Sequence, residues 1–142
     1  LLQFHFHHPS EHAMDGRRFD MECHFVHIND AGMLAVLGVF IEPGGENNVL
    51  APVWQHMPKS AGPEKKVASV HIDPVRLLPT NRDYFRYLGS LTTPPCSEKV
   101  IWSVFSQPGQ ASTAQVGQFA GLFNMNARPL QGLHRRLLLK SG

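Results

Sequence analysis

The sequence predicts one mostly-β domain with a few short helices. Several short runs show the two-residue alternation or the continuous apolarity of strands, whereas clear helical spacing of apolar residues is confined to few segments. Turn-forming residues such as Asp15-Gly16 and Pro43-Gly44-Gly45 separate these runs. The chain has 142 residues, of which 42% are hydrophobic and 17% are charged, so it is long enough for one domain with a sizeable core.

The first half of the chain contains three predicted strands and one predicted helix. The strands lie around His5-x-His7 and over residues 19–28 and 34–41, the last being a continuous apolar run typical of a buried strand. Helical spacing over residues 46–57 predicts a helix, with Asn47 or Asn48 as its cap and Pro52 tolerated only in its first turn. We expect Trp54, on the apolar side of this helix, to lie in the core.

The second half continues with short elements. Residues 67–72 are interpreted as a short strand, and a turn or short helix is expected to start at Asp73-Pro74. Strands are predicted over 84–88, 100–105 and 137–139, and residues 126–133 are expected to be extended. The two prolines of the loop over residues 89–96 make it rigid. The clearest helix spans 112–123, where Ser112 and Gln115 form a capping box ahead of an apolar stripe that includes Phe123.

Charge and cysteine content exclude several classes of protein. The net charge is only +2 and the basic residues are scattered, so the sequence has no nucleic-acid-binding footprint. No apolar run is long enough to span a membrane. Cys23 and Cys96 permit one disulfide at most. Alternation with Glu22 and His24 turns Cys23 to the other side of its strand, where we expect a small buried apolar residue.

Three histidines form a candidate metal site. In a strand His5 and His7 point to the same side, and His24 joins them if its strand pairs antiparallel with theirs. Three imidazoles with no fourth protein ligand are the pattern of an open catalytic zinc site. Gln3 and Glu22 each precede a histidine by two residues and can accept its second ring N–H. The alternative is a pair of half-buried strand histidines with an ordinary ion pair.

The motifs together resemble a known family. Their order and spacing are similar to those of the α-class carbonic anhydrases, and most of all to the bacterial exported members, in the segments Q-F-H-F-H, S-E-H, M-E-C-H-F-V-H, L-A-V-L-G, G-S-L-T-T-P-P-C and N-A-R-P. The resemblance implies a central, twisted, largely antiparallel sheet with a few short surface helices. It also implies reversible hydration of carbon dioxide to bicarbonate and a proton by attack of zinc-bound hydroxide. Sulfonamides and small anions are the implied inhibitors, and the periplasm or the cell exterior is the implied location.

The resemblance also assigns roles to residues. His5, His7 and His24 match the zinc ligands, while Gln3, Glu22 and the backbone carbonyl of Asn126 match the groups that orient them. Thr92 matches the threonine that accepts a hydrogen bond from the hydroxide and donates one to a buried carboxylate, here Glu11. An apolar wall for carbon dioxide and a neighbouring threonine complete the implied pocket, and their residues are Val26, Val36, Leu91, Val100, Trp102 and Thr93. His12 matches a buried structural histidine.

The family's domain is longer at its N-terminus, so residues 1–142 are expected to be the C-terminal portion of a single domain. The proton-shuttle histidine and the cysteine that bridges to the position of Cys96 in exported members belong to the part that the sequence does not contain. Whether this chain alone is active is therefore a separate question. A zinc-binding fragment without catalysis is one alternative.

A cupin-type metal enzyme is the other alternative, because His5-x-His7-x-x-x-Glu11 copies the metal-binding triplet of that family. In a cupin Glu11 binds the metal, which is then iron or manganese. A cupin also needs a histidine soon after the Pro43-Gly44-Gly45 turn, and none follows until His56.

Overall fold

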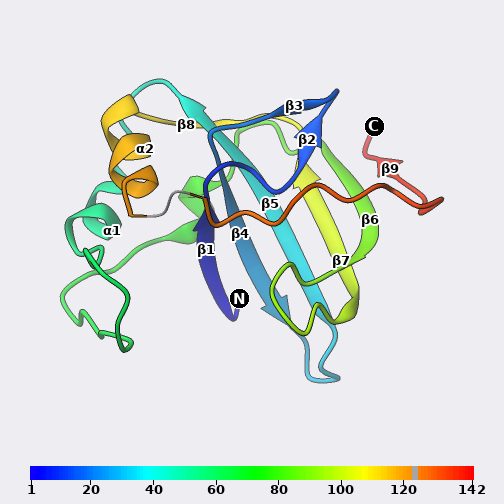
Figure 1. The fold of residues 1–142 in the computed structure, drawn as a ribbon, viewed down its shortest axis with the longest axis horizontal. Coiled ribbons are helices and arrows are strands. Elements are labelled where there is room, and N and C mark those ends of the chain that lie inside the picture. The colour runs from blue at the N-terminus through cyan, green and yellow to red at the C-terminus, as the bar shows by residue number, and fades with distance from the viewer. Residues whose placement is uncertain (123–124) are drawn as a thin grey trace.

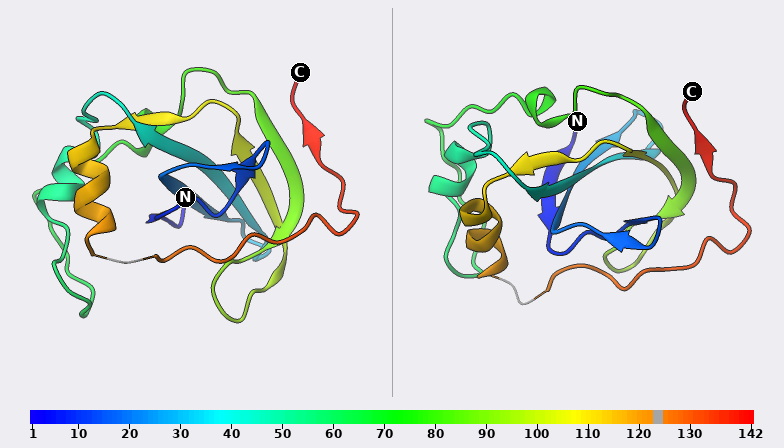
Figure 2. Two further views of the ribbon diagram at one scale, coloured as in Figure 1. Left: turned by 45° about the horizontal axis from the view of Figure 1, so that its top comes forward. Right: turned by 90° about the horizontal axis from the view of Figure 1, so that it is seen from above.

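A single twisted, mixed sheet organises the protein, as the ribbon of the computed structural model shows (Figure 1). The structure describes residues 1–122 and 125–142. Six strands follow one another in the order β1-β4-β5-β7-β6-β9, and β8 pairs with β5 beyond the end of β7. Two short helices gather at one end of the sheet (Figures 1 and 2). The prediction of a mostly-β fold with a few short helices is confirmed.

The strands that carry the histidines pair as expected. β1 (Gln3–His7) lies antiparallel to β4 (Met21–Ile28), with His5 directly opposite His24, and β4 lies antiparallel to β5 (Leu34–Pro43), with His24 opposite Gly38. Because side chains alternate along each strand, His5, His7 and His24 share one face of the sheet.

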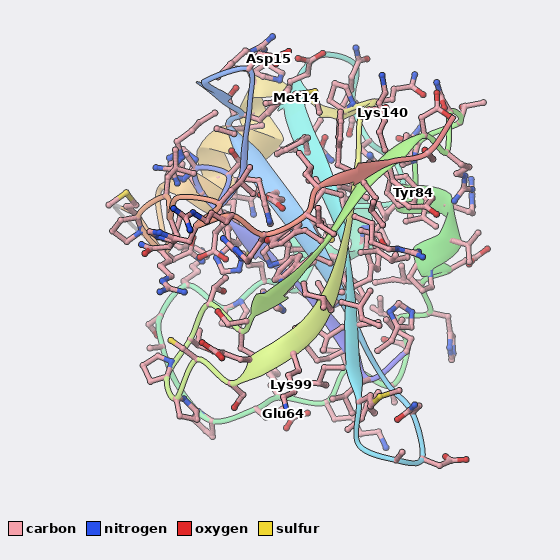
Figure 3. All side chains as sticks on the ribbon, turned by 90° about the vertical axis from the view of Figure 1, so that its right-hand side faces the viewer. Met14, Asp15, Glu64, Tyr84, Lys99 and Lys140 are labelled. Carbon is pink, nitrogen blue, oxygen red and sulfur yellow. The ribbon has the colours of Figure 1, made fainter. Side chains whose placement is uncertain are left out.

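A small hairpin delays the start of β4, which was predicted from residue 19. β2 (Ala13–Met14) pairs with β3 (Arg17–Arg18) around Asp15-Gly16, whose φ angles of 51° and 78° are the left-handed values that a tight hairpin turn requires. Met14 and Asp15 lie at the outer end of this hairpin (Figure 3). The sequence therefore predicted the turn correctly but not the two short strands beside it.

The remaining strands build the other half of the sheet. β6 (Tyr84–Ser90) and β7 (Glu98–Phe105) are both longer than predicted, and β9 (Leu139–Lys140) is a two-residue strand on the free edge of β6. β8 (Gly109–Ala111) was not predicted. β7 and β8 run parallel to β5, so the sheet is mainly but not wholly antiparallel.

The strand predicted over residues 67–72 is wrong. Val70 N donates to Val67 O at 3.3 Å, which closes a turn there. The apolar residues alternate in this run, but within the described residues it pairs with no strand of the sheet, and alternation alone does not make a strand.

Two of the three helical segments are shorter than the sequence predicted. α1 (Ala51–Gln55) replaces the helix expected over 46–57; its N-cap is Leu50, and Asn47 instead accepts from the amides of Val49 and Leu50 in the preceding turn. α2 (Thr113–Ala120) begins after the predicted Ser112–Gln115 capping box, and its predicted end at Phe123 lies outside the described residues. The turn or short helix that was expected to start at Asp73-Pro74 is the 3-10 helix η1 (Pro74–Leu77).

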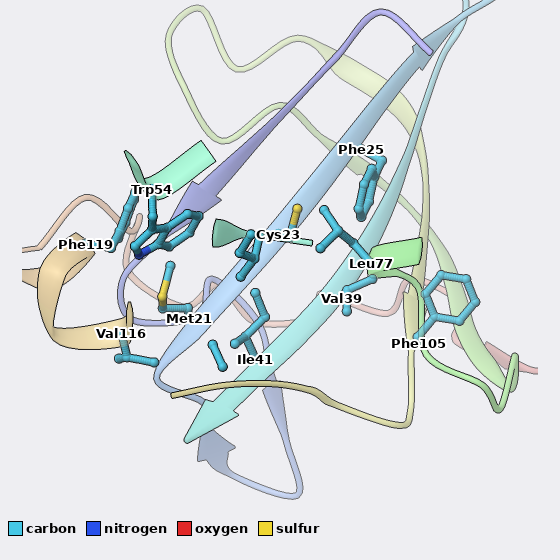
Figure 4. Close-up of a cluster of buried hydrophobic side chains, with 12 residues drawn as sticks. Met21, Cys23, Phe25, Val39, Ile41, Trp54, Leu77, Phe105, Val116 and Phe119 are labelled. Carbon is cyan, nitrogen blue, oxygen red and sulfur yellow. The ribbon is translucent and has the colours of Figure 1, made fainter. Parts of the chain in front are cut away.

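The sheet has apolar side chains on both faces. One cluster contains Met21, Cys23, Val39 and Ile41 and is covered at one end by Trp54, Val116 and Phe119 from the helices (Figure 4). The other contains Val26, Val36, Val100 and Trp102 and lies on the histidine face. Cys23 is buried on the face away from His24, as predicted, and both it and Cys96 are free thiols. No helix in residues 1–122 or 125–142 has the length and apolarity that crossing a membrane requires.

Candidate metal centre

Three imidazole rings converge on one point above β1 and β4. The ring centroids of His5, His7 and His24 are 4.6–5.3 Å apart, and Nε2 of His5 is 3.1 Å from Nε2 of His7. His7 and His24 are buried and His5 is half-buried. Within the described residues these three histidines form a group whose ligand atoms all lie within 4.8 Å of one another.

The second nitrogen of each ring meets an acceptor, and this fixes where the hydrogens are. His5 Nδ1 donates to Gln3 Oε1 at 2.8 Å, His7 Nδ1 to the carbonyl of Asn126 at 3.1 Å, and His24 Nε2 to Glu22 Oε1 at 2.9 Å. A carbonyl or carboxylate oxygen can only accept, so these nitrogens carry the hydrogens. The other nitrogen of each ring faces the other two rings and, without a second hydrogen, presents a lone pair to them.

The surroundings disfavour the charged form of the His5 and His7 rings. Burial and the neighbouring His24 and His7 lower the pKa of His5 to about 4. Burial and His24 also lower the pKa of His7, although the carboxylate of Glu11 partly opposes the shift. At neutral pH His5 and His7 thus hold unprotonated nitrogens in one place, which is the state in which histidine binds metals.

Glu11 points at the same place. Its Oε1 accepts from the backbone N–H of Arg128 at 2.7 Å, while its buried Oε2 has no hydrogen-bond partner. Oε2 lies 3.5 Å from His7 Nε2 and 3.9 Å from His24 Nδ1. The hydrogen bond that we expected from Thr92 to Glu11 is not formed in this structure: Oε1 accepts from the Arg128 amide, and Oε2 has no partner.

The donor set fits a divalent cation. Two nitrogens bound to zinc at tetrahedral angles are about 3.3 Å apart, close to the separation of His5 Nε2 and His7 Nε2. Three converging lone pairs and a buried, unsatisfied carboxylate oxygen repel one another, and a cation between them removes that repulsion. The third histidine, His24, lies on β4, ahead of the Pro43-Gly44-Gly45 turn after which a cupin needs its histidine, so the group does not match the cupin pattern.

A cavity of about 1060 Å³ opens beside the histidines. Its walls carry both polar and apolar side chains, among them the predicted pocket residues Thr92, Thr93, Val26, Val36, Leu91 and Trp102. Val100 does not line the cavity: it is fully buried in the apolar cluster that includes Trp102, so its predicted place in the wall is corrected to a place in the core.

Sequence reasoning missed the side-chain contacts that come from distant segments. The carboxamide of Asn126 accepts from His8 N at 2.7 Å and donates to Phe6 O at 3.0 Å, so it clamps the end of β1 as well as supplying its carbonyl to His7. The Arg128 amide, which donates to Glu11 Oε1, lies two residues further along the same segment. Only the family resemblance pointed to Asn126. No local sequence pattern predicts contacts between residues more than a hundred positions apart.

The loop that carries Thr92 is held in place by its own backbone. Leu91 N donates to Ser97 O and Cys96 N to Thr93 O, both at 2.9 Å, around a cis peptide bond between the two prolines. Trp102 Nε1 donates to Ser90 O at 3.0 Å and ties the start of the loop to β7. The prediction of an ordered, proline-fixed loop agrees with these contacts.

Comparison with known proteins places these features in a family context. The sequence profile of the eukaryotic-type carbonic anhydrases matches residues 1–142. A carbonic anhydrase from Nostoc sp. is 47% identical over 141 residues, which cover 99% of this chain and 53% of that protein. The chain spans about half the length of the curated relatives it matches.

Solved structures give the same result. An α-carbonic anhydrase from Thermovibrio ammonificans in complex with the inhibitor sulfanilamide is 48% identical and superposes with a TM-score of 0.91, over 95% of this chain and 60% of that one. A carbonic anhydrase from Chlamydomonas reinhardtii in complex with acetazolamide is 46% identical, with a TM-score of 0.90 over 98% of this chain and 64% of that one.

Proposed function

We propose, since the chain belongs to the eukaryotic-type carbonic anhydrase family, that its site hydrates carbon dioxide reversibly to bicarbonate and a proton. His5, His7 and His24 would hold one zinc ion. The observation that carries the proposal is the convergence of three imidazole lone pairs, each fixed by an acceptor behind its ring, with the unpartnered Oε2 of Glu11 beside them.

Zinc, when bound, supplies the Lewis acidity that makes water a nucleophile near neutral pH. The residues of the chain are proposed to bind and orient the substrate. Val26, Val36 and Trp102 present apolar surface beside the histidines, which suits an uncharged, linear molecule and not its charged product. Hydration forms one C–O bond and breaks one O–H bond, and the proton leaves to solvent.

Thr92 is proposed to orient the attacking oxygen. It lines the cavity that contains the histidines and also a second cavity of about 790 Å³ that Glu11 lines. Glu11 Oε2 is an acceptor that lacks a donor, so a hydroxyl that turns to it must donate its hydrogen there and accept a hydrogen bond from the oxygen that attacks. Such an arrangement points one lone pair at carbon dioxide, which is catalysis by orientation.

The zinc-loaded chain is expected to hydrate carbon dioxide, and Thr92→Ala is expected to keep its zinc while losing activity by about tenfold or more. Stopped-flow mixing with a pH indicator measures the rate, and atomic absorption measures the metal. Thr80→Ala, which removes an exposed threonine elsewhere, is the matched control.

The outcomes separate the alternatives. Stoichiometric zinc with only the uncatalysed rate would favour a zinc-binding chain without catalysis. An unchanged rate in Thr92→Ala would remove the orienting role from that residue while leaving the reaction in place.

An aromatic sulfonamide is expected to bind the zinc-loaded chain as its nitrogen anion, because the site offers a cation within apolar walls. The two relatives solved with sulfanilamide and acetazolamide support this proposal. Calorimetry of acetazolamide with and without zinc measures the binding, and small anions should compete with it. An N,N-dialkylated sulfonamide, which cannot ionise, is the control. Equal heats with and without zinc would contradict the prediction.

Export to the periplasm or the cell exterior belongs to the proposal as well. Cys96 is only partly buried on its loop and is not paired with Cys23, so it is available for a disulfide in an oxidising compartment. Fractionation of the source cells tests the location, and a cytosolic protein with a reduced Cys96 would contradict it.

A further inference from the structure

A line of hydrogen bonds connects the metal centre to Tyr87 of β6, which lies on the same face of the sheet, three strands away from β4. His24 Nε2 donates to Glu22 Oε1 at 2.9 Å, His12 Nδ1 donates to the same oxygen at 2.7 Å, and His12 Nε2 lies 2.6 Å from the hydroxyl of Tyr87. The four side chains come from β4, from the turn before β2, and from β6. The family resemblance implied a structural role for His12 and assigned no role to Tyr87.

The carboxylate in the middle of this line is fully occupied. Glu22 is 0% exposed, and its Oε2 accepts from the backbone N–H groups of both Glu11 and His12 at 2.9 Å. With the two histidine contacts on Oε1 it therefore receives four hydrogen bonds. Two donors face each oxygen, so neither oxygen has room for a hydrogen of its own, and both histidine rings must donate to it.

We propose that Tyr87 and His12 are positioning residues of the metal centre. Because Glu22 accepts from both rings, His12 must carry its hydrogen on Nδ1 and His24 on Nε2, which leaves Nδ1 of His24 as the lone pair that faces the metal site. The contact with Tyr87 holds the His12 ring in the orientation that makes this possible. The hydrogen bonds thus set the orientation and tautomer of a metal ligand from a strand three positions away in the sheet.

Tyr87 is itself held firmly enough for this role. Its ring stacks on Trp102 at an interplanar angle of 8°, and the guanidinium of Arg136 lies 5.1 Å from its ring centroid on the C-terminal segment. Burial and the charge of Glu22 raise the pKa of its phenol, so the hydroxyl keeps its proton at neutral pH. It then donates to Nε2 of neutral His12, and it accepts from Nε2 when His12 is protonated.

The test removes one hydroxyl from the line. This inference rests on the proposed zinc site, so the first measurement is the zinc affinity of the unmodified chain by competition with a chelator. Tyr87→Phe is expected to weaken zinc binding by about three- to tenfold, less than the about 10- to 100-fold that loss of a direct partner of a metal-bound histidine costs. The visible absorption of the cobalt-substituted chain should shift as well, because it reports ligand geometry.

Tyr84→Phe is the matched control. Tyr84 lies on the same strand as Tyr87, near Lys140 of β9 (Figure 3). Its backbone N–H, and not its hydroxyl, donates a hydrogen bond to Ser141 Oγ. The Tyr84→Phe variant should leave the zinc affinity and the cobalt spectrum unchanged. A purely structural role for Tyr87 would lower the melting temperature of the metal-free chain and leave both metal readouts equal to those of Tyr84→Phe, and that result overturns the inference.

If Tyr87→Phe does not fold, a second pair of variants tests the positioning role of His12. His12→Asn keeps a donor close to the position of Nδ1 but cannot reach Tyr87, whereas His12→Leu keeps the bulk and loses both contacts. Zinc should bind His12→Asn more tightly than His12→Leu, and equal affinity would refute the positioning role. An unmodified chain that binds no zinc would refute the proposed function itself, which is a different outcome.

Discussion

His5→Ala is expected to abolish retention of zinc. Its Nε2 and that of His7 face each other at 3.1 Å with both hydrogens turned away, so removal of one ring opens a site that needs three nitrogens. Loss of a supporting partner alone costs about 10- to 100-fold in metal affinity, and loss of a ligand must exceed that. The variant should bind zinc too weakly to survive dialysis and should show no sulfonamide binding and no catalysed hydration.

The fold should survive the same change, which makes the effect interpretable. His5 is half-buried on the edge strand β1, and within the described residues its ring donates a hydrogen bond to Gln3 and contacts the rings of His7 and His24, so the truncation removes little of the apolar core. His71→Ala, at an exposed histidine, is the control and should keep stoichiometric zinc. Stoichiometric zinc in dialysed His5→Ala, measured by atomic absorption, would refute the three-histidine assignment.

The strand alternation around His5, His7 and His24 predicted their shared face from the sequence, because that geometry is local and needed only one antiparallel pairing. Gln3 and Glu22 followed by the same two-residue rule, and the structure places both against the expected rings. The ligand roles of these residues remain predictions, but their positions relative to one another were open to local reasoning.

Contacts that depend on the path of distant segments could not be predicted from local sequence patterns. The Asn126 carboxamide on β1, the Arg128 amide on Glu11 and the Tyr87 hydroxyl on His12 join residues 75 to 120 positions apart. No periodicity of the sequence encodes these contacts, since they depend on where the C-terminal segment crosses the sheet and on where β6 stands in the strand order. The Arg128 amide, which donates to Oε1 of Glu11 and leaves Oε2 without a partner, is a contact of this kind.

Glu22→Gln is expected to damage both stability and metal binding, although it preserves the shape of the side chain. Glu22 is fully buried and accepts from two backbone N–H groups on one oxygen and from two histidines on the other. A glutamine must place its NH₂ either against the two backbone N–H groups, where both contacts become repulsive, or against the two rings. The rings can accept only by moving their hydrogens, and this puts a hydrogen on the His24 nitrogen that faces the metal site. We expect the free energy of unfolding to fall by about 3–5 kcal/mol and zinc affinity to fall by about 10- to 100-fold.

Glu42→Gln isolates the cause, because it makes the same chemical change at the partly exposed carboxylate that pairs with Arg17 and should alter stability by less than about 1 kcal/mol. Urea unfolding of the metal-free chains measures the stability difference, and chelator competition measures zinc. Gly38→Ala approaches the same carboxylate from β5: a Cβ there would lie 2.9 Å from Glu22 Oε1, so it must displace the oxygen that His12 and His24 share without changing any charge. If Glu22→Gln and Gly38→Ala both lost stability but bound zinc as tightly as the unmodified chain, the carboxylate would be a core element only, and the orientation of His24 would have to come from elsewhere.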